Sequence, residues 1–250
     1  MGEWSWTQLV EALRSDNGWL RSTAQRVIIE DYDGDSFVRG QLEALALDST
    51  AHGESRSHAL WTLEGCDDLR ADFLLQAMDD GDARVQAQAV RVAEALLSTG
   101  HEELTAAVVH LGSTSDSEAL GQQILHSLGS ARTVLGDTAL LQLAESKEPN
   151  ERTQEALLSG LYRRELEFLR ALCQSPGLDK RTGGHAKLVH SLARCVIREG
   201  NLSRINSMLE LIGDLLASGS WRAESIAGGI LASRPKGADS KPGPVRVARA

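Results

Sequence analysis

The stretch that decides the fold is Asp80-Gly81-Asp82-Ala83-Arg84-Val85-Gln86-Ala87-Gln88-Ala89, in which an acidic turn leads into an amphipathic helix. Aspartate and glycine are typical of turns, and aspartate is also typical of helix N-termini. The apolar side chains of Val85 and Ala89 then recur at the helical spacing of four residues. A second helical pattern, 69–78, precedes the turn. The stretch therefore predicts two helices joined by a short turn.

The same alternation of helical patterns and short polar breaks extends along the chain. No segment shows the period-two alternation of a half-buried strand, so the predicted class is all-α. The predicted helices pair as 4–14 with 19–30, 36–47 with 54–64, 69–78 with 83–97, 102–111 with 117–128, 134–145 with 151–161, 164–173 with 185–198, and 202–216 with 221–231.

Internal repetition separates a stacked array of helix pairs from a simple bundle. One small or apolar residue, here called the anchor, aligns between the second helices of successive pairs. A pair of helices cannot cover its own apolar face, whereas stacking buries that face between neighbours. The sequence therefore predicts a solenoid of about seven antiparallel helix pairs. The anchors are Ala24, Ala59, Ala89, Ile124, Ala156, Val189 and Ser225.

The stretch 80–89 resembles the HEAT-repeat pattern, in which an Asp-containing turn is followed by Val-Arg and then by Ala on the second helix. Gln86 stands where the pattern has Arg, whereas Arg21 and Arg56 occupy that place in the first two repeats. The resemblance implies an all-α, HEAT-like α-solenoid. It also implies that turn aspartates and helix arginines form a ladder, since Asp caps a helix N-terminus and attracts Arg.

Charge divides the chain into an acidic body and a basic end. The formal net charge is −9, but residues 233–250 carry five basic residues and one acidic residue, which leaves −13 on residues 1–232. We expect residues 1–232 to form one helical-repeat domain and the Pro/Gly-containing tail 233–250 to be disordered. The acidic body argues against nucleic-acid binding, and so against a DNA-glycosylase or lyase solenoid, which needs a basic face.

A closer resemblance rests on three segments. Asn17-Gly18-Trp19-Leu20-Arg21-Ser22-Thr23-Ala24-Gln25-Arg26 and Ser57-His58-Ala59-Leu60-Trp61-Thr62-Leu63-Glu64-Gly65 look like adjacent repeats of one bacterial family, and 122–129 is similar to a later repeat. The family comprises the haem-binding, membrane-bound-dehydrogenase-like proteins of planctomycetes and verrucomicrobia. The similarity covers 4–231. It implies a scaffold between a sugar-dehydrogenase-like propeller and a c-type cytochrome domain, in the cell envelope or periplasm.

The chain departs from that family in its chemistry. Cys66, Cys173 and Cys195 are isolated, so no Cys-x-x-Cys-His motif is present and we expect no haem in this chain. We also expect no propeller before residue 4. One alternative is therefore a fragment of a multidomain haem-linked protein whose catalytic and cytochrome modules are absent here.

No motif predicts catalysis, a metal or a cofactor. Residues 31–35 suggest a calcium loop, but Ser36 and Leu42 stand where an EF-hand needs Gly and Glu, so we expect an acidic turn that caps the next helix. His185 and His190 lie about 140° apart on a helix and cannot share a metal. The sequence contains neither a phosphate loop nor a nucleophile elbow. Residues 1–6 lack the basic and apolar regions of a signal peptide, and no apolar run reaches membrane-spanning length, so we expect no membrane insertion.

The candidate binding site follows from the repeat geometry. The position two residues after an anchor lies about 200° around the helix, facing away from the core. We expect Arg26, Trp61, Arg91 and His126 to form a row there that contacts a protein partner or a neighbouring domain. Alternatively, Trp61 only stacks on Arg26 or Arg91. The predicted function is thus a non-catalytic scaffold.

Overall fold

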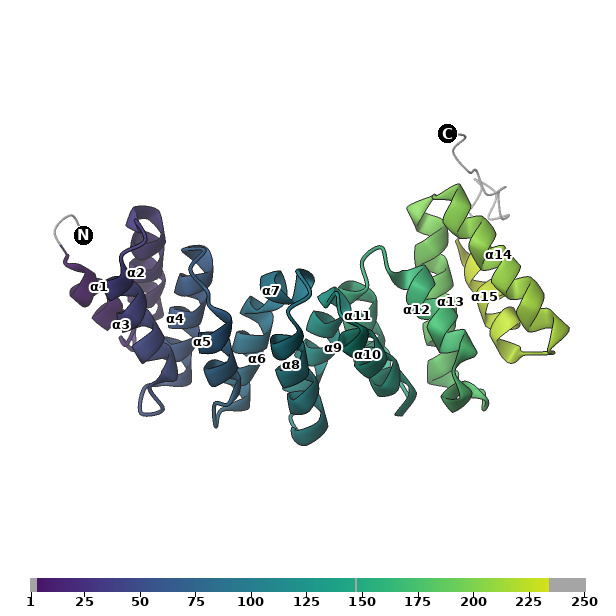
Figure 1. Ribbon diagram of the computed structural model, residues 1–250, viewed down its shortest axis with the longest axis horizontal. Helices are drawn as coiled ribbons and strands as arrows, with labels where there is room; N and C mark the ends of the chain where they lie inside the picture. Colours follow the sequence, from purple (N-terminus) through teal and green to yellow (C-terminus); the bar gives the residue numbers. More distant parts are fainter. Residues whose placement is uncertain (1–3, 147, 234–250) are drawn as a thin grey trace. The chain divides into compact units, whose positions relative to one another are not determined.

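The computed structural model describes residues 4–146 and 148–233. In this part of the chain it contains fifteen α-helices, one short 3-10 helix and no strand (Figure 1). The predicted all-α class is therefore confirmed. Apart from Ser233, the basic tail lies outside the described residues.

The first compact unit extends to Gly136. Its helices pair in chain order, α1 with α2, α3 with α4, α5 with α6 and α8 with α9, and the second helices stack as α2, α4, α6 and α9. This is the stacked arrangement that the repeat spacing predicts. The helices are α1 (Trp6–Ala12), α2 (Gly18–Asp31), α3 (Ser36–Leu47), α4 (Gly53–Gly65), α5 (Ala71–Met78), α6 (Ala83–Val92), α7 (Glu94–Ser98), α8 (Glu102–Thr114) and α9 (Glu118–Ser130).

The second compact unit begins at Asp137. Here α12 pairs with α13 and α14 with α15, while α13 packs against both α11 and α15. That residues 1–232 act as one repeat domain stays a prediction. The helices are α10 (Val134–Ser146), which starts before the boundary, α11 (Glu151–Gly160), α12 (Glu165–Gln174), the 3-10 helix η1 (Pro176–Leu178), α13 (Gly183–Glu199), α14 (Leu202–Ala217) and α15 (Trp221–Ala232).

Every predicted helix overlaps an observed one, and one predicted helix is divided in two. The segment predicted as 83–97 is two helices, because α6 ends at Val92 and α7 begins at Glu94. Neither Pro nor Gly occurs at this break, which coincides instead with polar contacts from Glu94 to α9. The acidic turn at 31–35 caps the next helix as predicted, since Asp35 Oδ1 accepts a hydrogen bond from the Phe37 amide at 2.8 Å.

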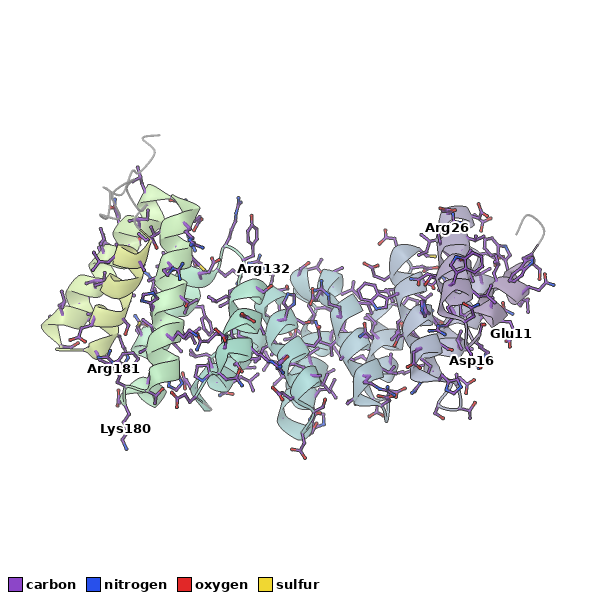
Figure 2. All side chains as sticks on the ribbon, turned by 180° about the vertical axis from the view of Figure 1, so that it is seen from behind. Glu11, Asp16, Arg26, Arg132, Lys180 and Arg181 are labelled. Carbon is purple, nitrogen blue, oxygen red and sulfur yellow. The ribbon has the colours of Figure 1, made fainter. Side chains whose placement is uncertain are left out.

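Side chains from successive helices pack together inside each unit (Figure 2). Six of the seven anchors are buried, which confirms the inward stripe of the second helices. Ala156 is the exception, because it is only half-buried while the next residue, Leu157, is fully buried. The register of α11 is therefore one residue later than predicted. Gln154 is buried on the same stripe, and its amide is satisfied by the Pro149 carbonyl oxygen at 2.9 Å.

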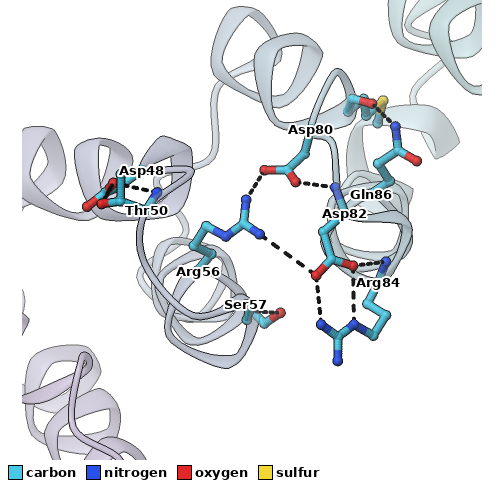
Figure 3. Close-up of polar contacts among 10 residues, drawn as sticks. Asp48, Thr50, Arg56, Ser57, Asp80, Asp82, Arg84 and Gln86 are labelled. Carbon is cyan, nitrogen blue, oxygen red and sulfur yellow. Dashed lines mark hydrogen bonds and ion pairs between the residues drawn. The ribbon is translucent and has the colours of Figure 1, made fainter.

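The Asp–Arg ladder is present between the second and third repeats (Figure 3). The Arg56 guanidinium on α4 pairs with Asp80 in the turn before α6, and both side chains are nearly inaccessible, at 7% and 8% exposed. Asp80 also accepts the Asp82 amide at 2.7 Å, and Asp82 caps α6 through the Arg84 amide at 2.9 Å. The ion pair thus ties one repeat to the turn of the next.

In the neighbouring repeats, the residues at the position of Arg56 make different contacts. Arg21 donates to the Ser15 carbonyl oxygen at 2.7 Å, and Gln86 donates to the Met78 carbonyl oxygen at 3.1 Å. Both bonds hold the turn of the residue's own repeat. In the first three repeats, the ladder implied by the HEAT resemblance is therefore one buried rung at Arg56, flanked by two local turn contacts.

Arg56→Ala should destabilise the chain strongly. Removing one partner leaves the Asp80 carboxylate buried without its cation, which costs about 3–5 kcal/mol in comparable pairs. The measurement is the free energy of unfolding in urea, followed by circular dichroism. Arg84→Ala is the matched control, because Arg84 is 76% exposed in its pair with Asp82 and should cost about 1 kcal/mol or less. Equal losses from both variants would contradict the assignment.

Gly229 sets the close packing of α15 on α13. A Cβ atom at this position would collide with the His190 carbonyl oxygen and lie 3.0 Å from the Ala193 Cβ. Gly213 on α14 has open space around the same point.

We therefore predict opposite effects of two Gly→Ala changes. Gly229→Ala should lower the free energy of unfolding by about 1–3 kcal/mol, because the helices must move apart. Gly213→Ala should raise it by up to about 1 kcal/mol, because alanine favours the helix and meets no neighbour. Thermal unfolding of the two variants would check this, and a stabilised Gly229→Ala variant would contradict the packing.

Candidate partner-binding site

The four residues of the predicted row lie on successive second helices of the first unit. Arg26 is on α2, Trp61 on α4, Arg91 on α6 and His126 on α9, each two residues after a buried anchor. The side chains of Arg26, Arg91 and His126 are 61%, 41% and 27% exposed, and Trp61 is half-buried. Because these helices stack in this order, the row crosses four repeats. Figure 2 labels Arg26, the first residue of the row.

Trp61 is oriented by a hydrogen bond to the next repeat. Its indole Nε1–H donates to Gln88 Oε1 on α6 at 2.8 Å. Gln88 lies one helical turn before Arg91, so the bond holds the indole beside the next member of the row. In the part of the chain that the structure describes, the guanidinium-over-ring contacts are Arg163 on Tyr162 and Arg222 on Trp221.

Glu94, at the start of α7, joins Arg91 to α9. One carboxylate oxygen pairs with Arg91, and the other accepts from Ser127 Oγ at 2.7 Å and Gln123 Nε2 at 3.2 Å and lies 3.0 Å from His126 Nδ1. Burial acts to raise the pKa of Glu94, but hydrogen bonds from Arg91, Ser127 and His126 outweigh it and lower the pKa. The carboxylate is therefore ionised at neutral pH.

A third contact links the first two repeats. Gln25, next to Arg26 on α2, places Oε1 2.7 Å from His58 Nδ1 on α4. Burial, together with the positive charge of Arg21, lowers the pKa of His58. The imidazole is therefore neutral at pH 7. We call the three contacts, Gln25–His58, Trp61–Gln88 and Glu94–His126, the second-helix ladder.

The second-helix ladder contains residues that the predicted row lacks. The ladder residues His58 and Gln88, and Gln123, which also contacts Glu94, each lie one residue before an anchor, so a polar side chain recurs at this position in three successive repeats. That recurrence is the sequence signal for the ladder. No comparable signal marks Glu94, because its role depends on the break between α6 and α7.

Across 4–146 and 148–233 no group of three or more His, Cys, Asp or Glu side chains could hold a metal ion. Within the same ranges, no helix is both long enough and apolar enough to span a membrane. Burial raises the pKa of the Cys66 thiol to about 11 and that of Cys173 to about 12, so both are protonated at neutral pH.

Comparison with known proteins found similar structures but no family. No family model matches the sequence, and no curated protein matches it. The dehydrogenase-like resemblance therefore stays a prediction. Similar solved structures include an engineered protein from the Northeast Structural Genomics Consortium, with 17% identity, a TM-score of 0.32, and coverage of 91% of this chain and 95% of that one.

Two further solved structures are also similar to this chain. A designed armadillo repeat protein has 17% identity and a TM-score of 0.32, covering 92% of this chain and 100% of that one. A second engineered protein from the same consortium has 20% identity and a TM-score of 0.27, with coverage of 92% and 98%.

Acid should remove the stabilisation that Glu94 provides. Its pKa in the folded chain lies below the ordinary value of 4.5, so its contribution is present above that pH and is lost as the pH falls through the folded pKa. The difference in free energy of unfolding between the wild type and Glu94→Gln should therefore shrink below about pH 4.5.

Urea unfolding at a series of pH values measures this difference. Glu102→Gln is the control, because Glu102 is an exposed carboxylate on the neighbouring helix α8 and should show a smaller pH dependence. A Glu94→Gln difference that persists undiminished at about pH 3 would contradict the proposed contacts.

Proposed function

We propose that this chain is a non-catalytic helical-repeat scaffold whose row of Arg26, Trp61, Arg91 and His126 binds a protein partner or a neighbouring domain. The observation that carries the proposal is the position of Trp61, held by Gln88 on the stacked second helices between two partly exposed arginines. Tryptophan and arginine are the residues most enriched among energetically dominant interface contacts.

The second-helix ladder supports this function because it orders the row before any partner arrives. Trp61 and His126 are each tied to a neighbouring helix, so little side-chain freedom remains to be lost on binding. The row also runs across stacked repeats, which suits an extended peptide or loop that contacts several repeats at once.

The direct test is partner recovery with a Trp61→Ala, Arg91→Ala double variant. Tagged wild-type and variant proteins are used to recover partners from an extract of the source organism, and circular dichroism checks that the variant is folded. We expect the recovered partner to fall by at least about tenfold, because two dominant contacts are removed.

A matched double variant keeps this test specific. Leu231→Ala with Arg198→Ala also removes one exposed apolar and one exposed basic side chain, but in the second unit. This control should recover the partner at the wild-type level. Unchanged recovery by the folded Trp61→Ala, Arg91→Ala variant would show that the row is only structural.

A further inference from the structure

The first repeat has a groove at a position where the next three repeats have buried residues that face a neighbouring helix. Four residues before their anchors, Ser55, Val85 and Leu120 are all buried, at 2%, 0% and 0% exposed. These residues belong to α4, α6 and α9, each of which packs on the preceding second helix. Leu20 occupies the same position on α2, where no described second helix precedes it, and it is only half-buried.

The exposed side of Leu20 opens into an apolar groove of about 570 Å³. Trp4 and Ala12 line it together with Leu20, and Trp4 is 41% exposed. Trp19, beside Leu20, is 70% exposed. In the next three repeats the position of Trp19 holds Glu54, Arg84 and Ala119, all of them exposed. A tryptophan therefore stands next in sequence to the lining residue Leu20, where the following repeats carry ordinary surface residues, and exposed apolar side chains gathered in one region mark interaction sites.

Two exposed carboxylates, Glu11 in the lining of the groove and Asp16 next in sequence to the lining, form what we call its rim, and Figure 2 labels both. Glu11 lines the groove with 72% of its side chain exposed, and Asp16, next to the lining residue Ser15, is 97% exposed. The guanidinium of Arg14 contacts both Glu11 and Asp48. Its Nε lies 3.4 Å from Glu11 Oε2, whereas its Nη1 lies closer, 2.8 Å, to Asp48 Oδ2. The carboxylates on the rim therefore keep most of their exposure and favour a basic ligand.

We infer that this groove docks a basic amphipathic helix of a partner protein. Inside the unit the corresponding surface of each second helix is covered by a helix, α2 on α4, α4 on α6 and α6 on α9, so a helix is the element whose shape fits. Its apolar side covers Leu20, Trp4 and Trp19, as in other complexes of a helix in a groove. Its lysines or arginines face Glu11 and Asp16.

The test uses the full chain and two synthetic peptides. Each peptide is a helix of about 18 residues with leucines at i, i+3, i+4 and i+7, flanked by lysines in one peptide and by glutamates in the other. Binding is measured by calorimetry and by the shift of tryptophan emission. We expect the lysine peptide to bind and the glutamate peptide to bind at least about tenfold more weakly.

Variants locate the site and separate it from the row. Leu20→Glu should weaken binding of the lysine peptide by at least about tenfold, and Trp19→Ala, at an exposed position that the fold tolerates, should also weaken it. Leu231→Glu, an exposed leucine in the second unit, should leave binding unchanged, as should the Trp61→Ala, Arg91→Ala variant. Glu11→Lys with Asp16→Lys should reverse the preference between the two peptides.

Four outcomes would overturn the inference. Neither peptide binds, or both bind equally well. Sedimentation shows a dimer that Leu20→Glu dissociates, which assigns the groove to a second copy of the chain. Finally, Arg246→Glu with Arg249→Glu shifts the tryptophan emission without any peptide, which assigns the groove to the chain's own basic end.

Discussion

A helix pair of this length cannot bury its own apolar stripe, and the rest of the structure depends on that constraint. The anchors Ala24, Ala59 and Ala89 have no exposed surface, and their helices pack both on the first helix of their own repeat and on the second helix of a neighbouring repeat. Small anchors also let the helix axes approach closely. Gly229 on α15 has the same effect on the packing of α15 against α13. Stacking is thus the source of both the core and the continuous outer surface of the second helices.

Polar contacts between neighbouring repeats are specific to the residues that they join. Apolar stripes are interchangeable, but Arg56 fits only a repeat that presents Asp80 at the end of its turn. Such a buried pair adds little net stability, because desolvation offsets much of its attraction, while a mismatched neighbour would leave a charge unpaired. The second-helix ladder also joins neighbouring repeats. Its three contacts differ in chemistry, so each one matches a single pair of repeats.

The sequence predicted the helices and their order because these depend on local periodicity and turn residues. It also predicted the inward stripe, with one error at Ala156, where Leu157 and buried Gln154 shift the register of α11. The contacts of Glu94 with Arg91 and with three α9 side chains were not predicted. Glu94 and the α9 side chains lie about thirty residues apart and meet only after the helix break at Ala93, which no Pro or Gly announces. Side-chain contacts between repeats depend on packing that a single helix does not encode.

The contacts within the row indicate how it would receive a partner. The indole N–H of Trp61 is already bonded to Gln88, so a partner would meet the face of the ring. Arg26 shares an exposed pair with Glu30, which contributes little and is readily exchanged for a partner's carboxylate. Arg91 is held by a carboxylate that three α9 side chains also contact. Arg26 and the ring of Trp61 would therefore make the first contacts with a partner. Arg91 would stay paired with Glu94 and so help to hold α9 beside the row.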